Sequence, residues 1–194
     1  MALLGLLGGC FYETSTPPTG PGVLVIGDSN VADGGPTWVE TLGATYTTTV
    51  DGVPGADSKT WFTDTTWPQR ISEVLAEHPG VAGVVQLGTN DAGTAAGAAA
   101  FAANVDAILA VIPSETVVLW NNVRLPVIEG WTAENVATVN AALTAATATW
   151  PNLQIEDEAG HPEWIADTAL HFTPAGYTEL ASWTLANLNA ALAP

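Results

Sequence analysis

Ser29, Asn90 and His171 are the side chains whose chemical types suit catalysis by a nucleophile, although they lie far apart in the sequence. Ser29 stands in a Gly-Asp-Ser sequence that directly follows the apolar run at residues 23–26. A serine hydroxyl becomes nucleophilic when a base such as histidine can take its proton. The amide of an asparagine can donate hydrogen bonds to a developing oxyanion. Together these residue types predict acyl transfer, provided that the fold brings them to one place.

Apolar runs and helical stretches alternate along the chain, and these elements must position the three side chains. The apolar runs are nearly continuous, which is typical of strands buried on both faces of a parallel sheet. The helical stretches carry apolar stripes or are rich in alanine. We therefore expect one α/β domain with a five-stranded parallel sheet between two layers of helices. The predicted strands are 23–26, 44–50, 81–87, 116–120 and 153–156, and the predicted helices are 36–42, 67–78, 94–112, 133–149 and 174–191.

Candidate site residues follow three successive predicted strands. Ser29, Gly55 and Asn90 each come just after the end of a strand. Open α/β folds build their sites where the carboxyl ends of parallel strands share an edge, so we expect these residues to lie along that edge. His171 lies just before the last helix, whose start is marked by Thr173-Pro174. A helix packed on the sheet would bring His171 back over Ser29.

Each of these residues also has a purely structural interpretation. The Asp-Ser dipeptide before Asn30 could cap the next helix. Asn90 could form an Asx-turn after its strand, and Gly52 is expected to serve as a turn residue. His78 and His161 are interpreted as ordinary surface or core histidines.

The composition excludes several classes of partner. The chain has 194 residues and a net charge of −17, with 3 Lys and Arg against 20 Asp and Glu. Lys59, Arg70 and Arg124 cannot form a basic patch, which argues against binding of nucleic acid or of an anionic membrane surface. The charge suits neutral esters or acylated sugars better than polyanionic substrates. No His and Cys cluster has metal-ligand spacing and no nucleotide motif is complete, so we expect neither a metal nor a cofactor.

The first 21 residues are expected to lie outside the folded domain, which we place at residues 22–194. They begin with an apolar segment, and the Leu-Gly-Gly-Cys sequence that ends at Cys10 resembles a bacterial lipobox. Residues 14–22 are rich in Pro, Gly and Thr, which predicts a flexible tether. These features favour an extracellular or cell-surface protein, tethered to a membrane through a lipid on Cys10. The alternative is a frayed apolar tail with a chance cysteine.

Four sequence blocks resemble those of the SGNH hydrolases, also called the GDSL esterase/lipase family. The third block is the most discriminating, because it matches in full. The resemblance covers residues 22–190, with the blocks in the family's order. The matching segments are Gly27-Asp28-Ser29, Val53-Pro54-Gly55-Ala56, Gly88-Thr89-Asn90-Asp91, and His171 with the Phe-Thr-Pro-Ala-Gly-Tyr sequence after it.

The resemblance implies a flavodoxin-like three-layer α/β/α fold and a serine hydrolase of carboxylic esters. It assigns the nucleophile to Ser29 and the general base to His171. It builds the oxyanion hole from the backbone N–H groups of Ser29 and Gly55 and from the side chain of Asn90. The Gly-x-Ser-x-Gly sequence of ordinary α/β-hydrolases is absent, because Val31 takes its last place.

The sequence departs from the family pattern at two places. Asn30 follows the serine where an apolar residue is usual, and we expect this change to be harmless. The family's acid lies three residues before the histidine, where this chain has Thr168. We hypothesise that Asp167 orients His171 from one residue further away. The alternative is a Ser–His dyad in which a carbonyl or Thr168 orients the ring.

We expect a short-chain esterase or a carbohydrate O-acetyl esterase that works through an acyl-serine. The alternatives are a lipase or thioesterase for longer acyl chains, an O-acetyltransferase that uses the same residues, and a non-catalytic cell-surface binding module on the same fold. Four tryptophans near predicted loops could form a platform for a sugar, although packing explains each of them as well. These are Trp61, Trp67, Trp131 and Trp164.

Overall fold

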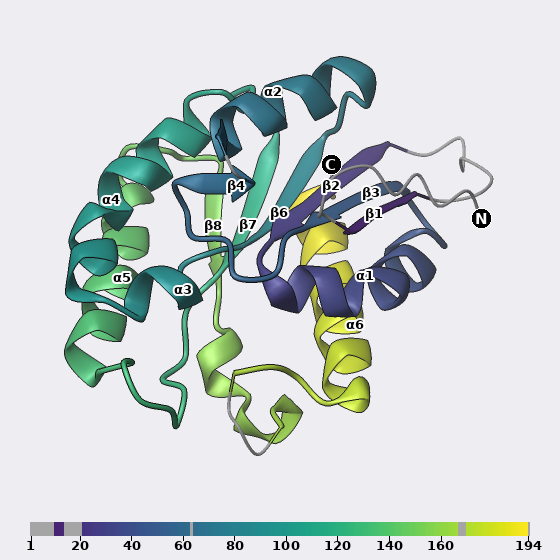
Figure 1. Cartoon of the computed structure of the whole chain (residues 1–194). Helices are drawn as coiled ribbons and strands as arrows, with labels where there is room; N and C mark the ends of the chain where they lie inside the picture. The colour runs from purple at the N-terminus through teal and green to yellow at the C-terminus, as the bar shows by residue number, and fades with distance from the viewer. Residues whose placement is uncertain (1–9, 14–20, 63, 167–169, 194) are drawn as a thin grey trace.

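A central six-stranded sheet organises the protein, whose computed structural model describes residues 10–13, 21–62, 64–166 and 170–193. Its strand order is β1-β3-β2-β6-β7-β8, with β1 antiparallel to β3 and the other five strands parallel (Figure 1). The parallel strands follow the flavodoxin-like order, so the fold class expected from the sequence is confirmed. The strands are β1 Cys10–Glu13, β2 Gly22–Gly27, β3 Thr47–Gly52, β6 Ala82–Gln86, β7 Val117–Asn121 and β8 Leu153–Glu156.

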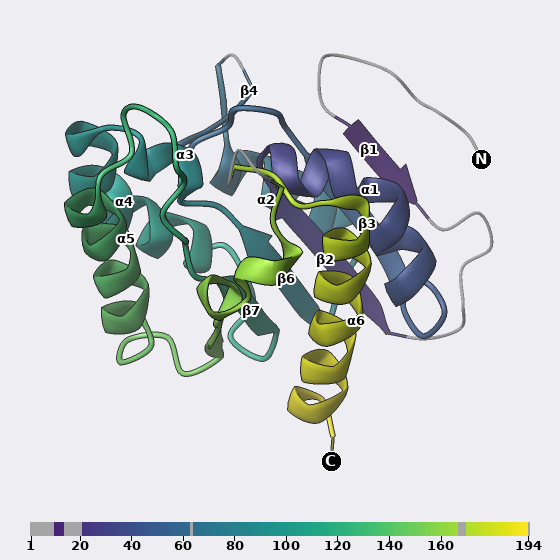
Figure 2. The same cartoon turned by 90° about the horizontal axis from the view of Figure 1, so that it is seen from below.

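Helices cover both faces of the sheet (Figures 1 and 2). One face packs on α1 and α6 around Val25 and Leu180, and the other packs on α2, α4 and α5 around Ile26 and Phe101. Two short 3-10 helices, η1 and η2, lie between β8 and α6. The helices are α1 Ser29–Leu42, α2 Trp67–Glu77, α3 Thr89–Ala92, α4 Ala95–Leu109, α5 Ala133–Ala146, η1 Glu158–Gly160, η2 Pro162–Trp164 and α6 Pro174–Ala191.

The alternation of side chains in β2 explains why its apolar run becomes a central strand. Val23 and Val25 point into the core shared with α1 and α6, whereas Leu24 and Ile26 point into the opposite core. Each is at most 5% exposed. Burial of such a side chain is worth about 1.5–3 kcal/mol relative to exposure. The strand therefore holds its carboxyl end, and the residues that follow, firmly in the middle of the sheet.

The carboxyl end of β2 is the topological switch point of the sheet. From β2 the chain goes first to β3 on one side and later to β6 on the other. Open α/β folds bind ligands in the crevice that such a reversal creates. The register aligns Gly27 of β2 with Gly52 of β3 and with Gln86 of β6. The segments that follow these residues therefore emerge side by side at one edge.

The first helix begins earlier than the sequence pattern indicates. It starts at Ser29 rather than at residue 36, and Pro36 lies inside it. Asp28 explains the early start, because its carboxylate accepts a hydrogen bond from the backbone N–H of Asn30 at 2.9 Å. This is an N-cap, so the structural interpretation of the Asp-Ser dipeptide is correct for its aspartate.

The second parallel strand also differs from its prediction. It runs from Thr47 to Gly52 rather than over residues 44–50, because the N–H groups of Thr45 and Tyr46 bind the Leu42 carbonyl and complete a turn. Gly52 is therefore part of the strand and not of a turn. A side chain at this position would overlap the backbone of α1, so glycine allows that helix to pack closely on β3.

Two short pairings have no clear signal in the sequence. The hairpin of β4 (Thr60–Phe62) and β5 (Thr65–Thr66) is too short to show a period. We expected residues 1–21 to lie outside the domain, but β1 pairs with β3, because an open sheet edge can accept another strand. Residues 1–9 and 14–20 lie outside the described residues. No helix in the described part of the chain is long and apolar enough to cross a membrane.

Candidate active site

Ser29 and His171 meet at the carboxyl end of β2. Nε2 of His171 lies 2.9 Å from Oγ of Ser29, which is hydrogen-bonding distance. Ser29 is the first residue of α1, and His171 belongs to the segment just before α6. Both side chains are half-buried. The structure thus brings together the two residues that the sequence pattern placed at one edge of the sheet.

Backbone contacts hold the segment that carries His171. Phe172 forms an isolated antiparallel bridge with Ile165. The carbonyl oxygen of His171 accepts a hydrogen bond from the N–H of Ala166 at 3.0 Å. Thr173 is the N-cap of α6, as its sequence predicts. The imidazole is therefore carried by a backbone that is held at His171 itself and at the two residues after it.

The acid expected to orient His171 lies outside the described residues. Residues 167–169 include both Asp167 and Thr168. The hypothesis that Asp167 completes a triad therefore stays a prediction, as does the dyad alternative. The described residues on either side, Ile165 and Phe172, are joined by their bridge.

Asn90 connects three strand ends. It lies in the short helix α3 that follows β6. Its Nδ2 donates a hydrogen bond to the carbonyl oxygen of Ala56 at 2.8 Å and lies 3.3 Å from Oδ2 of Asp28. These partners belong to distant segments, so a local Asx-turn does not explain the side chain. Its amide instead joins the segment around Gly55 to the end of β2.

Gly55 and the start of α1 present backbone donors beside this amide. Gly55 has a φ of 78°, a conformation that glycine adopts readily and other residues rarely do. A Cβ at this position would meet no atom within 4 Å, so the space next to it is open. The N–H of Ser29 lies in the first turn of a helix, where it has no acceptor within the helix. These groups and Asn90 are the donors that the family resemblance assigns to an oxyanion hole.

Asp28 is buried next to the serine. Its side chain is 1% exposed. Burial raises the pKa of Asp28 to about 7, and nearby Asp91 acts in the same direction, whereas the hydrogen bond from Asn30 and the charge of Arg124 oppose it. Below that pH the carboxyl is mostly neutral. It then places no negative charge beside Ser29, where a developing oxyanion would be repelled.

Asp91 fixes the helix that carries Asn90 to the segment that follows Gly55. Its carboxylate accepts hydrogen bonds from the backbone N–H of Ser58 at 2.9 Å and from the Ser58 hydroxyl at 2.6 Å. Asp91 is 2% exposed, and burial raises its pKa to about 6. The last residue of the third sequence block thus has a structural role that is distinct from catalysis.

A buried polar cluster next to the histidine segment has little signal in the sequence. Nη1 of Arg124 lies 2.7 Å from Oε1 of Glu158, and Nε2 of Gln86 donates a hydrogen bond to Oε2 of Glu158 at 3.1 Å. In the sequence, Arg124 stands out only as one of three basic residues. Its position just after a buried strand is the one signal that it would be buried too.

Asn30, which we expect to be a harmless departure from the family pattern, is buried and makes a polar contact. It is 4% exposed, and its Nδ2 lies 3.4 Å from the carbonyl oxygen of Leu170. An apolar residue could not make this contact with the residue that precedes His171. The departure from the family pattern therefore adds a polar contact between α1 and the histidine segment.

Two of the four tryptophans considered for a sugar platform belong to the core. Trp67 is 0% exposed and Trp164 is 8% exposed, so packing is their role. Trp131 is half-buried and donates its Nε1–H to the carbonyl oxygen of Thr89 at 2.7 Å, next to Asn90. Trp61 is also half-buried and lines an open pocket of about 340 Å³ together with Gly55.

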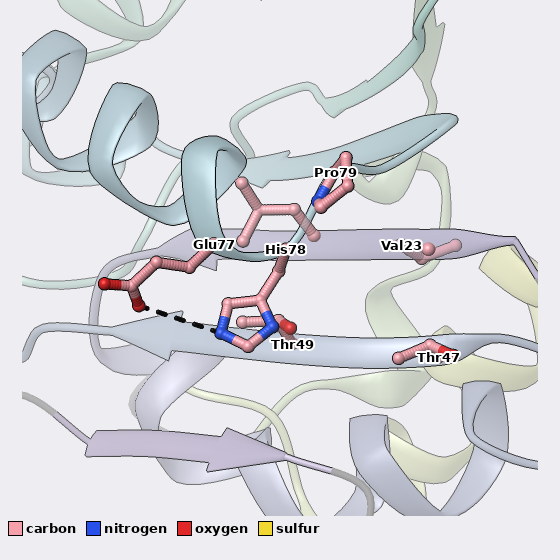
Figure 3. A pocket seen from close by; sticks show the side chains of 8 residues that line it. Val23, Thr47, Thr49, Glu77, His78 and Pro79 are labelled. Atoms are coloured by element: carbon pink, nitrogen blue, oxygen red, sulfur yellow. Dashed lines mark ion pairs between the residues drawn. The ribbon is translucent and has the colours of Figure 1, made fainter. Parts of the chain in front are cut away.

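The other two histidines lie away from the serine. His161 stacks on Trp164 with ring centroids 3.8 Å apart. His78 ends α2 and lines a pocket of about 230 Å³ at the opposite, amino end of β2 (Figure 3). Its Nε2 lies 3.9 Å from a carboxylate oxygen of Glu77. Both therefore fit their interpretation as surface or core histidines.

Residues 25–178 match the GDSL-like Lipase/Acylhydrolase family. No match to the sequence is found among curated proteins. The fold resembles that of Est24, a carbohydrate acetylesterase from Sinorhizobium meliloti, with a TM-score of 0.71 and 13% identity over 88% of this chain and 99% of that one.

Two further solved structures share the fold. The C-terminal catalytic domain of peptidoglycan O-acetyltransferase A from Streptococcus pneumoniae has a TM-score of 0.64 and 17% identity, over 89% of this chain and 93% of that one. The native aryl esterase of M. smegmatis has a TM-score of 0.70 and 15% identity, over 89% and 100%.

Proposed function

Since this chain belongs to the GDSL-like Lipase/Acylhydrolase family and is an SGNH-type esterase, we propose that it hydrolyses esters through an acyl-serine on Ser29. The observation that carries this proposal is the distance of 2.9 Å between Nε2 of His171 and Oγ of Ser29. A histidine in that position can accept the hydroxyl proton as the oxygen attacks.

The first half of the reaction forms the acyl-enzyme. Ser29 Oγ bonds to the ester carbonyl carbon while its proton passes to His171 Nε2. The carbonyl oxygen becomes an oxyanion, which accepts hydrogen bonds from the N–H groups of Ser29 and Gly55 and from Asn90. One such donor is worth about 10²–10³ in rate. The carbon–oxygen bond of the ester then breaks, and His171 returns its proton to the leaving alcohol.

The second half releases the acid. A water molecule loses a proton to His171 Nε2 and its oxygen attacks the acyl carbon on Ser29. The tetrahedral intermediate uses the same three donors. When it collapses, the carboxylic acid leaves and Ser29 recovers its proton from the histidine. In the proposed triad, Asp167 orients the imidazole through both halves.

Short acyl groups on carbohydrate are the substrates that we infer. The open pocket beside Gly55 is lined by the half-buried ring of Trp61 and by the polar residues Asp57 and Thr60, which suits a sugar with one apolar face. The net charge of −17 favours a neutral substrate over a polyanionic one. The carbohydrate acetylesterase from S. meliloti shares the fold over almost its full length.

O-acetyl transfer is the second candidate. The same residues would form the acyl-serine, and a sugar hydroxyl would replace water in the second half. The likeness to the catalytic domain of a peptidoglycan O-acetyltransferase favours this reading. The two differ only in the acceptor, so the ratio of released acetate to acetylated sugar separates them.

A substrate series tests the proposal. We expect acetyl and propionyl p-nitrophenyl esters to be cleaved with much higher kcat/KM than the octanoyl and palmitoyl esters. We also expect acetate release from O-acetylated oligosaccharides, measured by enzymatic assay. A preference for the longest chains would point instead to a lipase, and inactivity of the folded protein on every ester would point to a binding module.

A location at the cell surface remains part of the proposal. A lipid on Cys10 would place the attachment point at the first residue of β1, directly at the sheet edge. Mass spectrometry of the protein from its native host tests this. An unmodified Cys10 in an uncleaved chain would rule out the lipid tether.

A further inference from the structure

A buried ion pair lies next to the histidine segment, near the carboxyl ends of β6, β7 and β8. Arg124 follows β7 and Glu158 begins η1, and their side chains are 9% and 8% exposed. Nη1 of Arg124 contacts Oε1 of Glu158 at 2.7 Å, while Gln86 at the end of β6 holds the other carboxylate oxygen at 3.1 Å. The pair is thus anchored to three neighbouring elements of the rigid sheet edge.

The guanidinium also packs on the residue next to His171. The Cζ atom of Arg124 lies 4.6 Å from the centre of the Phe172 ring. Phe172 is 4% exposed, and the centroids of its ring and of the Tyr177 ring in α6 lie 5.3 Å apart. The phenylalanine is therefore enclosed between a cation fixed to the sheet and a helix. Phe172 directly follows His171 in the chain.

This arrangement is costly for stability. Within the described part of the chain, Nε and Nη2 of Arg124 are buried and have no hydrogen-bond partner. Unpaired buried donors and a desolvated ion pair usually lower stability relative to apolar residues of similar volume. A costly cluster at a sheet edge that carries Ser29 and Asn90 points to a role in function rather than in folding alone.

We propose that Arg124 and Glu158 are positioning residues for the reaction: the pair holds Phe172, and Phe172 holds the His171 imidazole at the Ser29 hydroxyl. Neither side chain contacts the reacting atoms. The guanidinium supplies the flat surface on which the ring rests, and the carboxylate fixes the guanidinium. This inference rests on the proposed function for its kinetic consequences, but not for the structural link itself.

Steady-state kinetics of Arg124→Met and Glu158→Gln test whether the pair affects catalysis. We expect kcat for p-nitrophenyl acetate to fall at least tenfold in each variant while KM changes less than threefold, because the substrate contacts stay in place. The matched control is Glu156→Gln, which alters another buried glutamate of the same region. Glu156 is 3% exposed and binds Asn187 of α6 at 2.6 Å, away from Phe172. We expect its kcat to stay within twofold of wild type.

Hydrogen exchange tests the structural link without turnover. The N–H of Ala166 donates to the His171 carbonyl, and the N–H of Thr173 donates to the Trp164 carbonyl, each at 3.0 Å. We expect both amides to exchange at least tenfold faster in Arg124→Met than in wild type, and unchanged in Glu156→Gln. If wild type proves inactive, the proposed function fails, and this measurement still decides the positioning proposal.

A double-mutant cycle covers the case in which Glu158→Gln fails to fold. Phe172→Leu removes the aromatic face but keeps an apolar side chain. If Arg124 acts through Phe172, the double variant with Arg124→Met loses no more kcat than the worse single variant. Multiplicative losses, wild-type kcat in Arg124→Met, or unchanged exchange of the two amides would each overturn the proposal.

Discussion

The contact between Ser29 and His171 joins residues that are 142 positions apart in the sequence. The polar side chains around it differ in what they do. Asp28 caps α1, and Asp91 fixes the segment after Gly55. Asn90 remains as the side chain whose amide faces the same strand ends as the serine. The candidate catalytic residues thus lie next to Asp28 and Asp91, which belong to the same sequence blocks and make structural contacts.

Removal of the Asn90 amide tests its proposed place in the oxyanion hole. We expect Asn90→Ala to lower kcat by about 10²–10³ and to leave KM nearly unchanged, because the lost donor acts mainly in the transition state. The matched control is Asn152→Ala. Asn152 donates to the Thr116 carbonyl at 2.8 Å, before β7 and therefore at the far end of the sheet. Equal kcat values for the two variants would exclude the role for Asn90.

A separate experiment tests whether Asp167 is the acid that orients His171. We expect Asp167→Ala to lower kcat by about 10⁴ if this carboxylate fixes the histidine tautomer. Thr168→Ala should then retain activity within a few-fold. The steady-state kcat of both variants on p-nitrophenyl acetate separates the hypotheses. Full activity in Asp167→Ala would favour the Ser–His dyad.

The sequence predicted these catalytic candidates because their neighbours show where each strand ends. Ser29 and Asn90 follow apolar runs, and His171 precedes a clear helix cap. The partners of Arg124 and Asn30 could not be predicted in this way. Their contacts join segments that only the tertiary fold brings together, and no local period or turn chemistry marks them.

At the scale of elements, the junction between η2 and α6 sets the histidine segment against the sheet. Gly176 lies in the first turn of α6, where a side chain would overlap the carbonyl group of Trp164. The Thr173 hydroxyl accepts the N–H of Gly176 at 2.9 Å. The absence of a side chain therefore lets the 3-10 helix and the longer helix meet next to His171.

A methyl group at this junction should separate the two elements. We expect Gly176→Ala to lower the free energy of unfolding by about 1–3 kcal/mol, as overpacked sites do, and to reduce kcat as well. Gly83→Ala is the control, because a Cβ there meets its nearest atom at 3.9 Å. Urea unfolding measures the free energy of unfolding of both variants, and their kcat is measured on p-nitrophenyl acetate. A Gly176→Ala variant as stable as Gly83→Ala would contradict the tight packing.

At this scale, some elements were predicted with their bounds. The strand at 153–156 and the helix at 174–191 match their predicted bounds. The prediction failed at Pro36, because the cap at Asp28 outweighs the proline as a helix start. It failed at residues 10–13 because strand pairing at an edge depends on the partner strand and not on the local sequence.

The whole molecule combines strong acidity with buried carboxyl groups. The net charge is −17. Burial raises the pKa of Glu158 to about 7, with Asp28 acting in the same direction and Arg124 opposing it. Together with Asp28 at about 7 and Asp91 at about 6, three buried carboxyl groups therefore hold protons at mildly acid pH.

The free energy of unfolding should fall as pH rises from 5 to 8. The folded protein then keeps protons that the unfolded chain has already released, so the stabilisation is complete below pH of about 4 and is lost through pH 6–7. The slope is at most about 1.4 kcal/mol per pH unit for each titrating carboxyl. Urea unfolding in about 0.5 M NaCl measures it, since salt screens the surface charges but not the buried ones. Glu158→Gln should flatten the slope, and stability that rises over this range would contradict the assignment.

The most direct test of the proposed reaction is to trap the acyl group. Wild-type protein is mixed with p-nitrophenyl acetate, quenched in acid within milliseconds and digested for mass spectrometry. We expect one acetyl group on the peptide that contains Ser29, none in Ser29→Ala, and much slower labelling in His171→Ala. Turnover that survives in Ser29→Ala, or acetyl found on another residue, would contradict the acyl-serine mechanism.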